Sequence, residues 1–188
     1  MKDENTFAGR VHENEKTICV FDTAPPVASP LAPRPAFLAA YERLSNLAEA
    51  ATGPALAVAA VYSRARVVSA CLVPDRTALV IGRHTESGLR LTNAAVALRQ
   101  MALLARHDGE RMAVHLWDLN TEQPFSTEDG ATTSALVSDG PVYLSLAEYS
   151  LWIIPAQTLA GLPAGAKDAW EALPARHFLD RRGPNRSL

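Results

Sequence analysis

The chain has 188 residues, 48% of them hydrophobic and 20% charged, which is ordinary for a globular domain with its own core. Its formal net charge of −2 excludes a molecule-wide attraction to nucleic acid. No apolar run reaches the roughly 18 residues of a membrane span, and MKDENTFAGR at the N-terminus has no signal-peptide core. We therefore expect a cytoplasmic protein without membrane contacts. Cys19 and Cys71 are expected to be free thiols.

Residues 1–35 are expected to form an N-terminal segment that ends in a proline-rich connector. KTICVF is a candidate short strand, and five prolines between positions 25 and 35 predict an extended, stiff connection. Residues 36–53 carry apolar side chains at three- and four-residue steps, which predicts an amphipathic helix. Two interpretations of this helix stay open, because it can pack on an edge or face of the domain or dock on a partner.

Residues 54–155 alternate short apolar segments rich in β-branched side chains with turn signals. Runs that predict strands are 55–62, 66–74, 77–83, 112–119, 141–146 and 150–155, and Asp-Gly pairs at 108–109, 129–130 and 139–140 predict turns. Several short strands at this spacing predict a sandwich or a barrel. Residues 93–107 (NAAVALRQMALLARH) are good helix formers, so a helix there remains an alternative to a loop and a strand.

Residues 156–188 are expected to form a C-terminal extension. A short helix is predicted between Pro163 and Pro174, with Trp170 packing back on the domain. The last residues are locally basic, and we expect a frayed, solvated tail there, with a nucleic-acid or lipid patch as the alternative. The arginines concerned are Arg176, Arg181, Arg182 and Arg186.

The sequence contains few signs of chemistry. It has no HxxxH or CxxC pair, no GxSxG elbow, no Walker loop and no GxGxxG, so we expect no catalytic residue, no metal and no cofactor. A small enzyme stays open as a hypothesis if His107, His115 and Asp118 meet a serine or cysteine in space. The more informative feature is Gly82-Arg83 at a strand end, because the planar guanidinium fork of arginine suits a phosphate.

The order of features around this arginine resembles a forkhead-associated (FHA) domain over just over half of the chain. VIGR at 80–83 matches the family's strand end, and LRLT at 89–92 stands where the next strand belongs. WDLNTEQPF begins like the family's D-L-x-S turn, and residues 137–155 match its closing hairpin. The resemblance implies an all-β, FHA/SMAD-like β-sandwich of about eleven strands, with the helix before it and a short helical extension after it.

The family reads phosphothreonine peptides with loops at one end of the sandwich. The arginine of its G-R pair carries over to Arg83. The serine of its S-R-x-H segment falls on Ala97 and the histidine on Gln100, while Arg99 nearby offers a compensating charge.

The family's N-G-T turn is also altered in this sequence. Its asparagine and glycine positions fall near Gln123 and Pro124, Thr121 keeps a hydroxyl, and Asn120 or Gln123 is a candidate replacement for the amide contact. Loss of the serine hydroxyl weakens phosphate binding by roughly ten- to a hundredfold, since a hydrogen bond to a charged group contributes about 1.5 to 3 kcal/mol.

These observations lead to three functional hypotheses. The first is a non-catalytic protein–protein interaction module, an adaptor or scaffold in signalling, whose binding need not involve phosphate. The second is a reader of Thr-phosphorylated partners that uses Arg83, Arg99 and Thr121. The third is the small enzyme. The alanine-, arginine- and proline-rich composition is compatible with a GC-rich bacterial genome.

Overall fold

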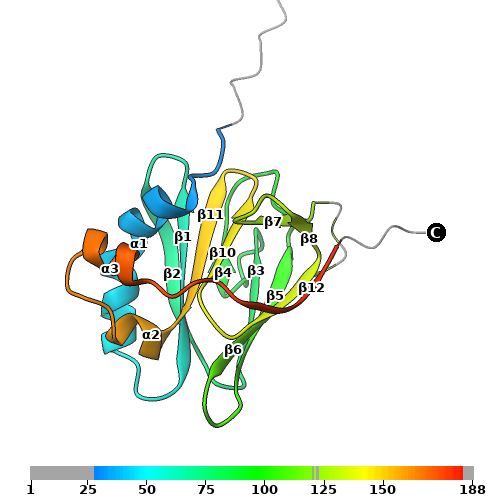
Figure 1. The fold of residues 1–188 in the computed structure, drawn as a ribbon. Helices are drawn as coiled ribbons and strands as arrows, with labels where there is room; N and C mark the ends of the chain where they lie inside the picture. Colours follow the sequence, from blue (N-terminus) through cyan, green and yellow to red (C-terminus); the bar gives the residue numbers. More distant parts are fainter. Residues whose placement is uncertain (1–27, 120, 122, 184–188) are drawn as a thin grey trace, which may run out of the picture.

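Two six-stranded β-sheets form a sandwich in the computed structural model, which describes residues 28–119, 121 and 123–183 (Figure 1). Sheet A contains, in spatial order, β2 (Arg66–Pro74), β1 (Ala55–Tyr62), β11 (Tyr149–Pro155), β10 (Val142–Leu146), β7 (Phe125–Thr127) and β8 (Thr132–Thr133). Sheet B contains β12 (Phe178–Arg182), β9 (Ala135–Ser138), β6 (Met112–Asp118), β5 (Met101–His107), β3 (Ala78–Gly82) and β4 (Leu89–Arg90). The predicted all-β sandwich is confirmed, with β1 to β11 between Ala55 and Pro155.

The main core lies between the two sheets and follows the period-2 alternation of the strands. In β6, for example, Met112, Val114 and Leu116 are buried, while the residues between them point outward. The Asp-Gly turns at 108–109 and 129–130 use glycine for its conformational freedom, since Gly109 and Gly130 have φ angles of 101° and 78°.

The helix alternative for residues 93–107 is wrong. Residues 91–100 are a loop, and β5 begins at Met101. Met101, Leu103 and Ala105 are fully buried in the main core at alternate positions, and β5 pairs with both β3 and β6. Burial of one strand face therefore outweighs the helical propensity of this segment.

The predicted N-terminal helix is present as α1 (Pro33–Glu49), three residues earlier than expected at its start. It packs on the outer face of sheet A, where Phe37 and Leu44 are fully buried. The chain before it is fastened to the same sheet, since the Leu31 carbonyl accepts a hydrogen bond from Ser150 (2.8 Å) and the Pro33 carbonyl one from Trp152 (3.2 Å). The interpretation of this helix as a free docking element is therefore wrong.

A second core forms under the helices and explains why β1 and β11 are apolar on both faces. The predicted short helix is α3 (Ala166–Ala172), preceded by α2 (Ala156–Ala160). Trp170 packs back on the domain as expected, with ring centroids 5.6 Å from Phe37 and 6.0 Å from Trp152. No helix within the described ranges is both long and apolar enough to cross a bilayer.

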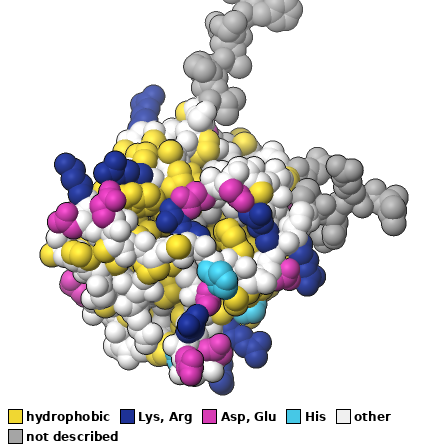
Figure 2. All heavy atoms as spheres, viewed as in Figure 1, with side chains coloured by type: hydrophobic (Ala, Val, Ile, Leu, Met, Phe, Trp, Pro, Cys, Tyr) yellow, Lys and Arg dark blue, Asp and Glu magenta, His cyan; other side chains and the backbone are white. Residues whose placement is uncertain are grey.

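The expectation of a frayed C-terminal tail is wrong for residues 176–182. After α3 the chain crosses the sandwich and adds β12 to β9 (Figure 1). Arg176 lies over the rings of Trp152 and Trp170 and pairs with Glu128 in the β7–β8 turn. Acidic and basic side chains lie side by side on this face (Figure 2).

The other arginines of this segment are paired too. Arg181 pairs with Asp129 at 2.6 Å and Arg182 with Asp180 at 3.1 Å, which does not favour the nucleic-acid alternative. Hydrogen bonds from the Thr127 hydroxyl and the Arg181 guanidinium hold the pKa of Asp129 below its usual range. Arg186, Cys19 and the KTICVF segment lie outside the described residues.

Candidate functional site at the loop end

One end of the sandwich, here called the loop end, gathers the turns and connections that the sequence singled out. It consists of the turns at 63–65, 83–88 and 147–148 and the connections 91–100 and 119–124. The described chain also enters at this end, because the Ala28 amide donates to Glu148 (3.2 Å). Glu148 in turn accepts a hydrogen bond from Asn93 (2.7 Å), which fixes the start of the 91–100 connection.

Arg83 lies at the centre of the loop end, where β3 stops. Its backbone amide donates to the Ala97 carbonyl (2.9 Å), and its side-chain Nε donates to the Val96 carbonyl (3.1 Å). Gly82 makes this crossing possible, since a Cβ there would lie 2.4 Å from the Leu98 carbonyl oxygen. The Gly-Arg pair thus lets a second segment pass over the strand end and orients the guanidinium.

Gln100, at the family's histidine position, joins the two long connections. Its side chain is fully buried, and its Oε1 accepts a hydrogen bond from the Ala97 amide (3.0 Å). Its Nε2 lies 3.2 Å from Asp118 Oδ1 and 2.6 Å from the Gln123 carbonyl, and it also contacts the Thr121 hydroxyl. Gln100 is therefore an internal support for the loop end and does not face a ligand.

Thr121 is also turned inward. Its amide donates to Asp118 Oδ2 (2.8 Å), and its hydroxyl bonds to the other oxygen of the same carboxylate. The Gln123 and Arg99 side chains are exposed. The structure thus brings Arg83, Arg99, Thr121 and Gln123 to one end of the sandwich, while Asn120 lies outside the described residues.

The described arginines divide into two groups by whether they pair with a carboxylate. Six are in such ion pairs: Arg34, Arg76, Arg111, Arg176, Arg181 and Arg182. Of these, Arg182 lies beside the loop end, because it faces Ala135, which faces Trp117. Seven described arginines are not in an ion pair with a described carboxylate. Five of them lie at the loop end: Arg64, Arg66, Arg83, Arg90 and Arg99. The other two, Arg43 and Arg106, lie elsewhere.

Sequence reasoning missed three of these arginines, Arg64, Arg66 and Arg90. Arg66 and Arg90 line a depression of about 280 Å³ between β2 and β4, together with Thr92 and the nearly buried Tyr149. No residue that lines it is acidic. The sequence gives no signal for this site, because β2 and β4 are edge strands of different sheets and meet only in the folded sandwich.

The side chains suggested for an enzyme are not brought together. In the β5–β6 register Leu104 faces His115 and His107 faces Met112, so the two histidines point to opposite faces of sheet B. Within the described ranges there is also no cluster of three or more histidine, cysteine or acidic side chains suited to a metal ion.

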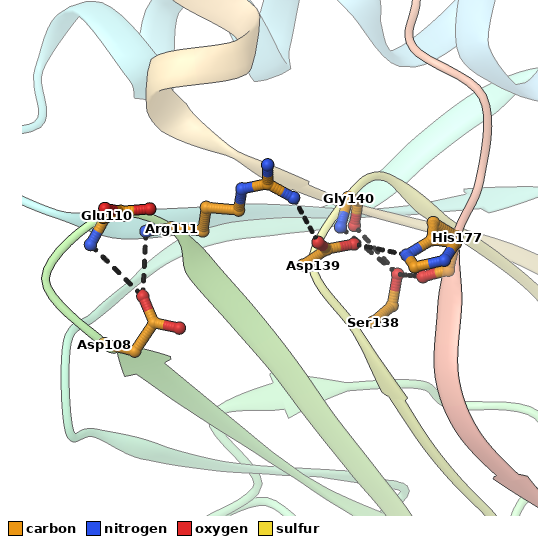
Figure 3. A network of polar contacts seen from close by, with 7 residues as sticks. All are labelled: Asp108, Glu110, Arg111, Ser138, Asp139, Gly140 and His177. Carbon is orange, nitrogen blue, oxygen red and sulfur yellow. Dashed lines mark hydrogen bonds and ion pairs between the residues drawn. The ribbon is translucent and has the colours of Figure 1, made fainter.

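Ser138, Asp139 and His177 lie close together and need a separate account (Figure 3). The Ser138 hydroxyl donates to the His177 carbonyl (2.7 Å) and not to its ring. The ring Nδ1 lies 3.1 Å from Asp139, which also pairs with Arg111 at 2.8 Å. Because the hydroxyl is buried and directed at the backbone, this group fastens the C-terminal segment to β9 and has no nucleophile–base pair.

Comparison with solved structures finds similar folds among FHA domains. The FHA domain of CT664 from Chlamydia trachomatis is 10% identical with a TM-score of 0.46, and the match covers 53% of this chain and 96% of that one. The first FHA domain of Mycobacterium tuberculosis Rv1747 is 12% identical with a TM-score of 0.42, covering 55% and 98%. Full-length yeast Pml1p is 11% identical with a TM-score of 0.47, covering 70% and 97%.

The two-sheet sandwich of this chain is established by its own strand pairing. Comparisons with protein-family models and with curated proteins found no match.

Proposed function

We propose that this protein is a non-catalytic interaction module whose loop end binds an anionic segment of a protein partner. The observation that carries the proposal is the set of five arginines at that end without a carboxylate partner among the described residues. Guanidinium groups without a carboxylate partner at one end of the domain attract acidic residues or phosphate groups of a partner. They also raise the rate at which that partner associates with the domain. In a cell such a module would act as an adaptor or scaffold.

The geometry favours binding that does not require phosphate. Ala97 supplies no hydroxyl where the family has serine, and the Thr121 hydroxyl is already bonded to Asp118. Arg83 therefore supplies charge and two terminal nitrogens, but these two neighbours add no hydroxyl donor for a phosphate. A carboxylate needs fewer donors than a phosphate, so acidic side chains are suitable ligands.

A second candidate function is a phosphothreonine-peptide reader. One observation favours it: the Nε bond to the Val96 carbonyl fixes the Arg83 fork, and a fixed fork is suited to a doubly charged group. Arg99 would then supply the second cation.

Fluorescence anisotropy with three degenerate peptide libraries, which carry threonine, phosphothreonine or glutamate at the central position, tests both functions. We expect the two anionic libraries to bind comparably, with affinity that falls as salt rises. Arg83→Ala should weaken binding about ten- to a hundredfold. The control is Arg43→Ala, because Arg43 is an exposed helix arginine far from the loop end.

Binding of the phosphothreonine library alone, lost in Arg83→Ala, would select the reader instead. If neither anionic library binds better than the threonine library, or if Arg83→Ala binds like the unaltered protein, the proposal is wrong.

A further inference from the structure

The outward side of sheet B is apolar, although it is not the side that faces the main core. On β3, β5, β6 and β9 the strand registers place ten side chains on this side, here called the outer B face: Ala78, Val80, Ala102, Leu104, Arg106, Ala113, His115, Trp117, Ala135 and Val137. Eight of these ten are apolar. The edge strand β12 adds Asp180 and Arg182, which lie beside Val137 and Ala135 and pair with each other at 3.1 Å. An antiparallel sheet that faces water normally carries polar side chains at these alternate positions, so this pattern is typical of a sheet that is covered on both sides.

Sheet A shows what such a pattern means in this protein. Its outer face is also apolar, with alanines at positions 55, 57 and 59 and an aromatic ring at Trp152, and it is covered by α1. The three helices lie on that side of the sandwich only (Figure 1). No described helix packs on the outer B face, where Trp117 remains 37% exposed and Leu104 and Val137 are half-buried.

Apart from the Asp180–Arg182 pair of β12, the charge on the outer B face lies at one end. Burial and the nearby Arg106 charge lower the pKa of His115, so at neutral pH this imidazole is uncharged. Arg106 makes no ion pair with a described residue. It borders a groove of about 760 Å³ at the end of the sandwich opposite the loop end, lined also by Leu104, Arg76, Asp75 and Asp108. Both carboxylates are already bonded within the chain, since Asp75 accepts from the His107 amide and Asp108 from the Arg111 amide.

We propose that the outer B face binds an amphipathic helix of a partner protein, with its apolar stripe on the sheet and a carboxylate beside Arg106. Small side chains at 102, 113 and 135 leave room for a helix backbone, as the alanines of β1 do for α1. Charge complementarity favours an acidic partner over a second copy of this chain, because two copies would bring two uncompensated Arg106 groups into one interface. This surface is separate from the loop end and does not depend on its function.

Photo-cross-linking of the full chain tests the proposal. The protein, with p-benzoylphenylalanine at position 113, is expressed in cells of its natural host, and mass spectrometry identifies the cross-linked segment. The expected product is a segment of another protein with apolar residues at helical spacing and a flanking Asp or Glu. Arg106→Glu should reduce the yield at least about tenfold, whereas Arg43→Glu, a matched reversal on α1, should leave it unchanged.

Cross-links only to residues 1–27, only to a second copy, or to no protein segment would overturn the proposal. Thermal unfolding of the purified Val137→Thr variant gives an independent check, since threonine keeps the shape of valine. The melting temperature should shift by less than about 2 °C if the face is free. A larger loss would mean that the chain itself or a second copy already covers it, contrary to the proposal.

Discussion

Replacing Gln100 by methionine should remove hydrogen bonds from the loop end without removing side-chain volume. The amide group makes about three hydrogen bonds at full strength, one accepted from Ala97 and two donated among three nearby acceptors, because an NH₂ group has two hydrogens. At about 1 kcal/mol each, the free energy of unfolding should fall by about 3 kcal/mol. Leaving the half-buried Ala97 amide without a partner adds to this loss.

Urea denaturation followed by circular dichroism measures this change, and the control is Gln157→Met on the exposed side of α2. Hydrogen exchange at Leu119 provides a local readout, because this amide donates to the Gln100 backbone carbonyl (3.0 Å) and should exchange faster when the side-chain network is lost. If the stability of Gln100→Met falls by less than about 0.5 kcal/mol, the account of Gln100 as the support of the two connections is wrong.

Three further predictions concern stability and reactivity. Arg176→Ala should lower the free energy of unfolding by about 1 to 3 kcal/mol, since the Arg176 side chain is 17% exposed and stacks on two indoles. The Arg182 side chain is 74% exposed, so Arg182→Ala should change the free energy of unfolding by less than about 0.5 kcal/mol in the same denaturation assay. Asp129→Asn should lower the stability at pH 7 and make the melting temperature less dependent on pH in the acid range. The reason is that a carboxyl whose pKa is lowered in the folded state stabilises the protein above its unfolded pKa of about 4 and loses that contribution as pH falls below it. If the melting temperature of the variant falls with acid as steeply as that of the unaltered protein, this prediction is wrong. Burial raises the pKa of Cys71 to about 11. In a Cys19→Ser background, the Cys71 thiol should therefore react with a thiol reagent at pH 8 about a hundredfold more slowly in the folded protein than in the unfolded protein. Equal rates in the two states would contradict the burial of Cys71.

The strands that the sequence predicted are continuous runs of mainly apolar residues. Runs such as ALAVAAVY and SLWIIP bury nearly every side chain, so they can be recognised as strands without knowing which strands lie beside them. The β5 segment was harder, since MALLARH has the composition of a helix and becomes a strand only because β3 and β6 lie on either side of it. Short strands such as β8, and β12 with its charged FLDRR sequence, follow from pairing partners and not from their own residues.

The candidate site shows the same division. The position of Gly82-Arg83 at a strand end could be predicted, because the apolar run before it marks the strand. The role of Gln100 could not, since its partners come from positions 97, 118, 121 and 123, and no local pattern shows that these converge. The sequence also did not predict that the Thr121 hydroxyl points inward to Asp118, because an aspartate at position 118 is equally compatible with a solvent-exposed turn.

The alanines of β1 make α1 and the sandwich a single unit of folding. A fragment limited to the sandwich strands from residue 54 to 155 would leave Trp152 and Ile154 facing water, although both are fully buried in the whole chain. Its solubility would suffer accordingly. We expect the shortest fragment that can be produced and crystallised to run from about residue 28 to 183, because it keeps the three helices and β12 together with the sandwich.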